Sequence, residues 1–344
     1  MGQRANLVVV ENGDWKLYYD HWCANRLDIE LFWGPTLAKQ YIEQRPPIED
    51  RDEWLDEVWG EGSAVVDYDR RLVLWFGGVD ILYDIPQRRV LLELMQYQWP
   101  DWEIRWADGG VAEIGAYVGV DTEIFYSIEE PEPDNAIRIL TERPEDNCML
   151  LTVRHNSVTG AAQVFGCAES LKLGTDSLKS ILEIPTSSSL AWEGDMPTAG
   201  LHIDIEKKAI EYWFARPVAA IEERIQRKWP GWSTRWLKDN YEEHLLTADV
   251  DIELPWLDQR QIRADIIDYL RTNVCHVASN PVRELAIARD DTPIWKKILI
   301  WMKLTKPEDI QINPWTDEAR GSVGEKVDKF DILDKLERTS FVNE

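Results

Sequence analysis

The first part of the chain alternates short apolar runs with polar turns. Residues 7–10 and 15–19 are mostly β-branched or aromatic, and Asn12-Gly13 between them is the dipeptide most typical of a two-residue hairpin turn. Gly34-Pro35 precedes apolar positions at helical spacing over 36–44, and proline suits the first turn of a helix. The pattern therefore predicts a β-hairpin followed by a helix.

The same order of elements is expected further along the chain. A second hairpin is predicted over 64–76, and a helix starts at Pro86 and ends before Trp99, because the residue that precedes Pro100 avoids helical backbone angles. In the strand predicted at 102–106, apolar residues alternate with charged ones and should face a core. With a short helix at its end, the unit reads ββαββαβ(α).

A tryptophan-rich segment indicates that this unit occurs twice. Residues 99–106 read Trp-Pro-Asp-Trp-Glu-Ile-Arg-Trp and residues 229–236 read Trp-Pro-Gly-Trp-Ser-Thr-Arg-Trp, so five of the eight positions agree. Upstream, residues 7–23 match 151–167 at an offset of 144, and the offset falls to 137 at the second hairpin and 130 at the motif. We infer a tandem duplication that was followed by loop shortening.

These elements indicate an α+β protein with two tandem copies of the ββαββαβ(α) unit. Hairpins make the sheets mostly antiparallel, and the helices are expected to cover one face of each sheet. The acidic, proline-bearing segment 127–135 is the expected linker. The predicted domains are two repeat units and a helical, acidic appendage, at residues 1–128, 146–250 and 251–344. Helices of the appendage are expected at residues 258–272, 293–302 and 323–336.

Length and charge narrow the class of protein. The 344 residues suffice for two or three domains, and 44% hydrophobic with 29% charged residues is ordinary for a globular chain. The 63 acidic residues outnumber the 38 basic ones, which gives a formal net charge of −25. Such a charge repels phosphate backbones and anionic lipids, so nucleic acid and membranes are disfavoured as partners. Solubility is the plainest explanation, and a basic partner protein is the more specific one.

The cysteines give no sign of a disulfide framework or a metal site. The four of them form no C-x-x-C pair and no zinc-like pattern with the histidines. Free thiols fit a reducing compartment, and the apolar run at 7–10 is too short for a signal peptide or a membrane span. We therefore expect a cytoplasmic protein with no metal and no cofactor.

The doubled Trp-Pro-x-Trp motif allows two interpretations. One is an aromatic platform for sugars or bases. The other is packing, because burying one tryptophan removes roughly 150–250 Å² from water, and this alone explains why both copies keep the motif. We expect core residues. Arg105 and Arg235 lie on the opposite strand face and are candidate anion-binding residues, although pairing with a carboxylate of the same sheet is the commoner arrangement.

Differences between the copies mark candidate functional residues, because the fold needs what both copies kept. The first copy carries a polar and aromatic cluster that the second copy replaces mostly with small or apolar residues. Its members are Tyr18, Asp20, His21, Trp22 and Asn25. Histidine suits general acid–base work, but neighbours in a strand point to opposite faces, so Asp20 and His21 cannot pair directly within one. A binding surface and an ordinary exposed sheet face are the alternatives, and no catalytic residue is assigned.

Other candidate chemistry is weaker. No H-E-x-x-H, G-x-S-x-G, Walker or G-x-G-x-x-G pattern occurs in the sequence. Asp67 and Asp69 resemble the start of a metal-binding loop, but Arg70 and Arg71 would compete with a cation. A salt-bridged hairpin is the expected arrangement.

Three functional hypotheses follow. The leading one is a non-catalytic interaction protein whose acidic surface covers a basic partner protein, as inhibitors and immunity proteins do. The second is an enzyme that binds a sugar or nucleotide in a cleft between the copies, near Tyr18, Asp20, His21 and Asn25. The third is a structural subunit with an apolar patch around Trp295 and Trp301. The sequence leaves the oligomeric state open.

Overall fold

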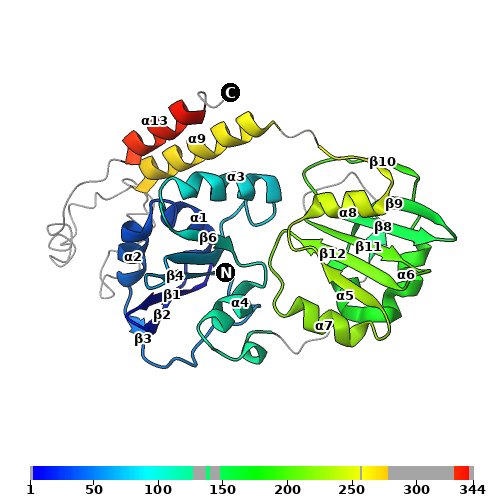
Figure 1. Cartoon of the computed structure of the whole chain (residues 1–344), viewed down its shortest axis with the longest axis horizontal. Coiled ribbons are helices and arrows are strands. Elements are labelled where there is room, and N and C mark those ends of the chain that lie inside the picture. The colour runs from blue at the N-terminus through cyan, green and yellow to red at the C-terminus, as the bar shows by residue number, and fades with distance from the viewer. Residues whose placement is uncertain (1–2, 127–136, 140–147, 256–257, 278–328, 341–344) are drawn as a thin grey trace, which may run out of the picture. The chain divides into compact units, whose positions relative to one another are not determined.

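The computed structural model describes residues 3–126, 137–139, 148–255, 258–277 and 329–340 (Figure 1). The chain divides into two compact units, residues 1–259 and 260–344. The larger unit contains both copies of the repeat, each with a six-stranded sheet. The expected linker at 127–135 lies outside the described residues, and the expected domain boundaries stay predictions.

The sheet of the first repeat consists of β1 (Ala5–Glu11), β2 (Asp14–Asp20), β3 (Pro47–Ile48), β4 (Gly62–Asp67), β5 (Leu72–Phe76) and β6 (Glu103–Trp106). Their order is β3-β2-β1-β4-β5-β6. Neighbours pair antiparallel except β1 with β4 and β5 with β6, which are parallel. The sheet is therefore mostly antiparallel, as the hairpin pattern predicts.

The sheet of the second repeat consists of β7 (Arg138–Ile139), β8 (Met149–His155), β9 (Val158–Phe165), β11 (Ala199–Asp204), β12 (Ala209–Phe214) and β13 (Ser233–Trp236). Their order is β13-β12-β11-β8-β9-β7. When β8 is aligned with β1, the five strands other than the β3 and β7 edges follow the same order with the same directions. This shared topology supports the tandem duplication. Two further short strands, β10 (Ser189–Ala191) and β14 (Asp251–Glu253), pair in parallel.

The helices also correspond between the copies. The first repeat contains α1 (Leu27–Glu30), α2 (Pro35–Glu43), α3 (Ile85–Gln96) and α4 (Gly110–Tyr117). The second contains α5 (Cys167–Leu173), α6 (Leu178–Glu183), α7 (Ile221–Lys228) and α8 (Tyr241–Ala248). Short 3-10 helices lie at η1 (Ala24–Arg26), η2 (Thr122–Phe125) and η4 (Gly174–Ser177).

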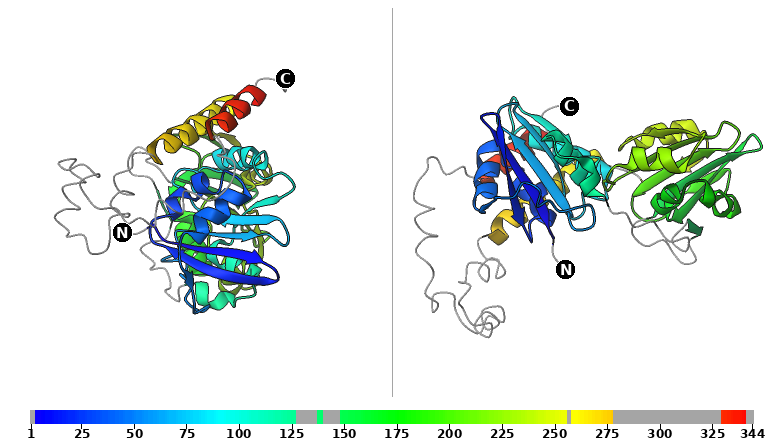
Figure 2. Two further views of the ribbon diagram at one scale, coloured as in Figure 1. Left: turned by 90° about the vertical axis from the view of Figure 1, so that its left-hand side faces the viewer. Right: turned by 90° about the horizontal axis from the view of Figure 1, so that it is seen from below.

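Helices cover both faces of each sheet (Figure 2). In the second repeat, Leu171, Ile181 and Ile225 of α5, α6 and α7 pack into the main hydrophobic core on one face. On the opposite face, α8 places His244 against Thr152 and Trp213. The expectation that helices cover only one face is therefore wrong, because the short helix that closes each unit lies on the other side of the sheet.

The first hairpin turn is held by a carboxylate of the second hairpin in both copies. Asn12 and Gly13 have positive φ angles of 58° and 76°, as a type I′ turn requires. The Asp69 carboxylate accepts hydrogen bonds from both of their N–H groups, at 2.8 and 2.7 Å. In the second copy, Glu206 accepts from the N–H of Asn156 at 2.6 Å.

The second hairpin itself differs from the expected arrangement in the first copy. Asp67 accepts from the N–H groups of Asp69 and Arg70 at 2.9 and 2.8 Å and from the Tyr117 hydroxyl at 2.6 Å. The expected ion pair does form in the second copy, where the Lys207 ammonium lies 3.2 Å from Asp204. A backbone N–H also donates to Asp204, from Lys207 at 2.9 Å, so both copies share the backbone contact and the second adds the ion pair.

We expect Asp69→Ala to lower the free energy of unfolding by about 1 kcal/mol, since two turn N–H groups lose their acceptor and must turn to water. Asp69→Asn keeps one acceptor oxygen and should cost less. Urea denaturation of the three proteins measures the effect. Equal midpoints for the wild type and Asp69→Ala would show that the contact does not stabilise the fold.

The Trp-Pro-x-Trp motif forms the same turn in both copies. The Trp102 N–H donates to the Trp99 carbonyl at 3.2 Å, and Trp232 donates to Trp229 at 3.1 Å. Proline at the second position and a positive φ at the third, 64° in the first copy and 78° in the second, are typical of a type II turn. The turn directs the chain from the preceding helix into β6 or β13.

The first tryptophan of each motif is a core residue, as the sequence predicts. Trp99 and Trp229 are fully buried, and their indole N–H groups donate to the carbonyls of Leu31 and Leu171, each at 2.9 Å. Each ring also meets the second tryptophan of its motif edge-on, with centroids 5.0 and 5.2 Å apart. The later tryptophans of both motifs are buried or half-buried.

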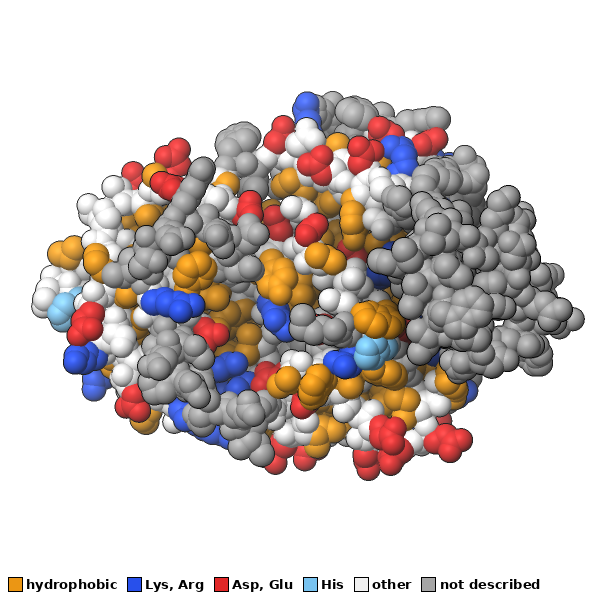
Figure 3. Space-filling view, turned by 180° about the vertical axis from the view of Figure 1, so that it is seen from behind, with side chains coloured by type: hydrophobic (Ala, Val, Ile, Leu, Met, Phe, Trp, Pro, Cys, Tyr) orange, Lys and Arg blue, Asp and Glu red, His pale blue; other side chains and the backbone are white. Residues whose placement is uncertain are grey.

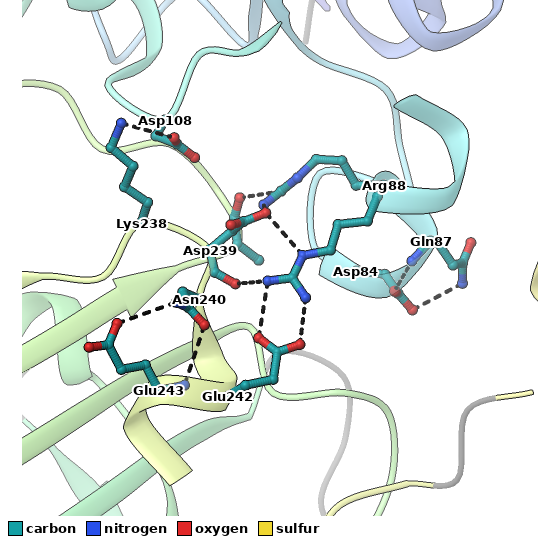
Figure 4. Close-up of polar contacts among 11 residues, drawn as sticks. Asp84, Gln87, Arg88, Asp108, Lys238, Asp239, Asn240, Glu242 and Glu243 are labelled. Atoms are coloured by element: carbon teal, nitrogen blue, oxygen red, sulfur yellow. Dashed lines mark hydrogen bonds and ion pairs between the residues drawn. The ribbon is translucent and has the colours of Figure 1, made fainter. Parts of the chain in front are cut away.

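Two arginines of α3 contact the second repeat (Figure 4). Arg88 is fully buried, donates to the Ala215 carbonyl at 2.7 Å and lies 4.4 Å from the Trp106 ring centroid. Burial lowers the pKa of Arg88 to about 10. The Arg89 guanidinium donates two hydrogen bonds to the Glu242 carboxylate, at 2.5 and 3.1 Å. The two repeats are thus joined by charged groups as well as by packing.

The second position after each tryptophan motif takes part in this contact. Asp108 and Lys238 correspond at the offset of 130, and their charged atoms lie 4.0 Å apart. Burial raises the pKa of Asp108 to about 6, and the negative charge of Asp239 is the second cause of this shift. Counterpart positions of the two copies therefore meet each other.

The smaller unit is described at two helices, α9 (Gln259–Val277) and α13 (Lys329–Ser340). Both agree with predicted helices, and Arg271 of α9 forms ion pairs with Asp334 and Glu337 of α13 at 3.2 and 2.9 Å. The predicted helix at 293–302, with Trp295 and Trp301, lies outside the described residues. In the part of the chain that the structure describes, no helix has the length and apolar character needed to span a bilayer.

Candidate functional site

The first-copy cluster is divided between a buried part and a surface part. The Tyr18 side chain is buried in β2, and burial raises its pKa. Asp20 forms an ion pair with the Arg45 guanidinium and accepts a hydrogen bond from the Trp22 N–H at 2.6 Å. The Arg45 guanidinium also lies 4.2 Å from the Tyr41 ring centroid. Asp20 thus anchors the chain after β2.

His21 and Trp22 lie at the surface. The Tyr19 hydroxyl and His21 Nδ1 are 2.7 Å apart, and the His21 ring meets the Trp22 ring edge-on with centroids 4.7 Å apart. Trp22 keeps 58% of its surface exposed, more than any other tryptophan that the structure describes. These three side chains form an exposed aromatic row rather than a proton-transfer chain with Asp20.

Asn25 lies apart from this row. Its side-chain oxygen is buried and has no hydrogen-bond partner among the described residues. The neighbouring Cys23 thiol is buried as well, which raises its pKa to about 12 and keeps it protonated at neutral pH. Among the residues that the structure describes, no three His, Cys, Asp or Glu side chains are grouped as metal ligands would be. Whether the cluster binds a ligand stays a prediction.

The two candidate arginines pair with carboxylates of their own sheets. Arg105 lies 3.5 Å from Glu103, on the same face of β6. Arg235 stands directly opposite Glu211 in the β12–β13 pair, with ion-pair atoms 2.6 Å apart, and it also pairs with Glu243 of α8. The expected pairing is confirmed, and anion binding by either arginine stays a prediction.

An acidic segment with two tryptophans, one half-buried and one exposed, follows β3. Residues 49–61 carry seven carboxylates and one arginine, together with Trp54 and Trp59. The reciprocal amide hydrogen bonds between Asn6 and Leu55, at 3.0 and 3.1 Å, fix this segment on the β1–β2 hairpin. The Trp54 ring packs on the Trp15 ring with centroids 5.8 Å apart.

The exposed end of this segment lies close to the aromatic row. β1 and β4 start at the same end of the sheet at which β2 finishes, and these strands are neighbours in the order β2-β1-β4. Trp22 follows β2 and Trp59 precedes β4, so the two indoles flank the start of β1, where Arg4 lies over the Trp59 ring at 4.8 Å. Val58 and Trp59 are 55% and 54% exposed. We call Trp22, Val58 and Trp59 the indole surface.

A buried polar cluster distinguishes the second repeat. The Thr152 hydroxyl lies 2.8 Å from His202 Nδ1 and 2.7 Å from His244 Nε2, and the Trp213 indole N–H donates to His244 Nδ1 at 3.0 Å. All four residues are buried. Burial lowers the pKa of both histidines, that of His244 to about 3, and the proximity of His202 adds to the shift. A β-carbon on Gly200 would lie 2.1 Å from the Trp213 indole nitrogen, so the close packing needs glycine there.

A residue difference between the two copies also marks this cluster in the sequence, outside the segment 14–25. At the established offsets, the first repeat has apolar residues at all four positions, namely Val8, Val65, Ile114 and Phe76. The strand registers agree, since Val8 stands opposite Val65 just as Thr152 stands opposite His202. The second copy therefore has a polar network where the first has an apolar contact.

Comparison of the chain with known proteins found no matching family model, no matching curated protein and no matching solved structure.

Proposed function

We propose that this chain is a non-catalytic interaction protein that binds and covers a basic partner protein, in the manner of an inhibitor or immunity protein. The observation that carries the proposal is the net charge of −25, which favours encounter with a positively charged surface. The 13-residue segment 49–61 concentrates seven carboxylates beside exposed aromatic side chains. Exposed aromatic groups within a charged surface are typical of protein-binding hot spots.

The surface composition fits such a role. Figure 3 shows one face on which hydrophobic side chains lie between acidic and basic ones. An interface needs such apolar groups in addition to charge, because charge sets the rate of encounter and apolar contact slows dissociation. The Cys23 and Cys167 thiols are buried and form no disulfide. This supports our proposal that the protein works in a reducing cytoplasm.

The alternatives have less support. The residues proposed for an enzyme site are divided between the buried Tyr18, the ion-paired Asp20 and the surface residues His21 and Trp22. The apolar patch proposed for a structural subunit centres on residues outside the described part of the chain. Both hypotheses stay predictions.

The proposal is tested by immobilising the full chain and exposing it to native extract from the source cells. We expect a basic protein to be retained at about 50 mM salt and released at about 500 mM, because exposed charges are screened beyond ~3–10 Å at high salt. Mass spectrometry identifies the retained protein. Recovery of no basic protein at either salt concentration would overturn the proposal.

A further inference from the structure

Tryptophans in and near the indole surface already bind cationic side chains of their own chain. The Arg4 guanidinium lies 4.8 Å from the Trp59 ring centroid, and the Arg51 guanidinium lies 4.5 Å from that of Trp15. Guanidinium groups are attracted to the face of an indole by the ring quadrupole. Trp59 remains 54% exposed beneath Arg4, so its ring offers further contact area. The geometry of this surface is therefore suited to cations.

The negative charge of the segment that precedes Trp54 also favours cationic side chains. Glu49, Asp50, Asp52 and Glu53 precede Trp54, and all four are exposed. Arg51, the single basic residue of the segment, is paired with Asp14 at 2.7 Å. Ile48 of β3 pairs with Leu17, so this acidic stretch continues beside the start of β2, whereas Trp22 and Trp59 lie at the other end of that strand. Its negative excess complements lysine or arginine side chains and repels acidic ones.

The second repeat lacks these features, although it has the same fold. Gly166 stands where the first repeat has Trp22. The connection between α6 and β11 carries only Glu193 and Asp195, and its single tryptophan, Trp192, is buried with its indole N–H donated to the Asp195 carbonyl at 2.7 Å. Since the unit folds without exposed indoles, their presence in the first copy is not required by the fold.

We propose that the indole surface of the first repeat is the docking site for a lysine- and arginine-rich segment of the partner protein. Cationic side chains at one end of that segment stack on Trp22 and Trp59, and others further along it pair with the carboxylates of residues 49–53 beside the start of β2. This inference rests on the proposed function and assigns it a place on the molecule. It also explains why the first copy alone keeps the aromatic row after β2.

The test measures binding of a fluorescein-labelled peptide of alternating arginine and glycine to the full chain by fluorescence anisotropy at low salt. A peptide with glutamine in place of arginine controls for the label and backbone. One variant removes both exposed indoles, Trp22→Ala with Trp59→Ala. Its matched control is Tyr97→Ala, which removes a 50% exposed aromatic ring after α3, away from this end of the sheet.

A second pair of variants separates local charge from net charge. Asp50→Asn, Asp52→Asn and Glu53→Gln neutralise three carboxylates beside Trp54. The control neutralises three exposed carboxylates of the second repeat, Asp176→Asn, Glu183→Gln and Glu222→Gln, so both triple variants have the same net charge. Circular dichroism confirms that every variant is folded.

We expect the double indole variant and the local charge variant each to bind the arginine peptide about tenfold more weakly than the wild type, and both controls to stay within about twofold. If the wild type binds and the surface variants match their controls, the docking site is wrong while the proposed function stands. If the wild type does not bind the arginine peptide better than the glutamine peptide, the docking proposal and its electrostatic basis both fail.

Discussion

Replacing Trp99 or Trp229 by alanine should lower the free energy of unfolding by about 3–5 kcal/mol, the usual cost of truncating a fully buried tryptophan. Each substitution opens a cavity beside the second tryptophan of the motif. It also leaves the carbonyl of Leu31 or Leu171 without the indole N–H that it accepts at 2.9 Å. Because the two sites share the same contacts, we expect similar costs.

Urea denaturation followed by circular dichroism measures these losses. Trp22→Ala is the matched control, since it removes an indole that is 58% exposed and should change stability by less than about 0.5 kcal/mol. A milder substitution, Trp99→Phe, keeps an aromatic ring and removes the hydrogen bond. Its loss of unfolding free energy should fall between those of Trp99→Ala and Trp22→Ala. A loss below about 1 kcal/mol for Trp99→Ala would contradict the core role of the motif.

Lowering the pH from 7.5 to 5.0 should destabilise the second repeat by about 2 kcal/mol through His244 alone. The pKa of His244 is about 3 in the folded protein because the ring is buried, whereas an unfolded histidine titrates near 6.5. Above pH 6.5 the ring is neutral in both states, and its contribution to stability is fully present. As the pH falls below 6.5, only the unfolded state binds the proton, so stability is lost at ~1.4 kcal/mol per pH unit until the folded pKa is reached. His202 shifts in the same direction and adds to the loss.

The first repeat supplies the control for this prediction. A variant with the first repeat's residues in the buried cluster carries Thr152→Val, His202→Val, His244→Ile and Trp213→Phe. Carboxylates elsewhere titrate equally in both proteins, so the difference between their urea midpoints at pH 7.5 and 5.0 isolates the histidines. Equal pH dependence in the wild type and the variant would mean that the buried rings accept protons without cost.

The periodicity of the chain predicts the elements better than their spatial arrangement. Asn12-Gly13 and the residues around it specify a hairpin locally, so the turn is predicted with its strands. The parallel pairing of β1 with β4 is not predictable in this way, because it joins strands separated by more than fifty residues through contacts that no local pattern specifies. The side of the sheet that α4 and α8 cover also depends on such distant contacts, so no local pattern predicts it.

The candidate site was partly predictable for a similar reason. Trp22 and its neighbours differ between the copies, and this difference is visible in the sequence. Trp22 and Trp59 lie at the same end of the sheet because of the strand order β2-β1-β4, which the sequence does not specify. His202 and His244 stand in separate elements of the sequence, and only the fold brings both to the Thr152 hydroxyl.

The contact between Asp108 and Lys238 bears on how the two halves of the gene can evolve. Recombination that made the repeats identical would place two aspartates or two lysines opposite each other, where an attractive pair now lies 4.0 Å apart. Like charges at that distance repel, so repeats made identical at this position should lose up to about 1 kcal/mol of stability, the usual limit for a partly exposed pair. The difference between the two copies at this position thus favours their contact with each other over contact between identical copies.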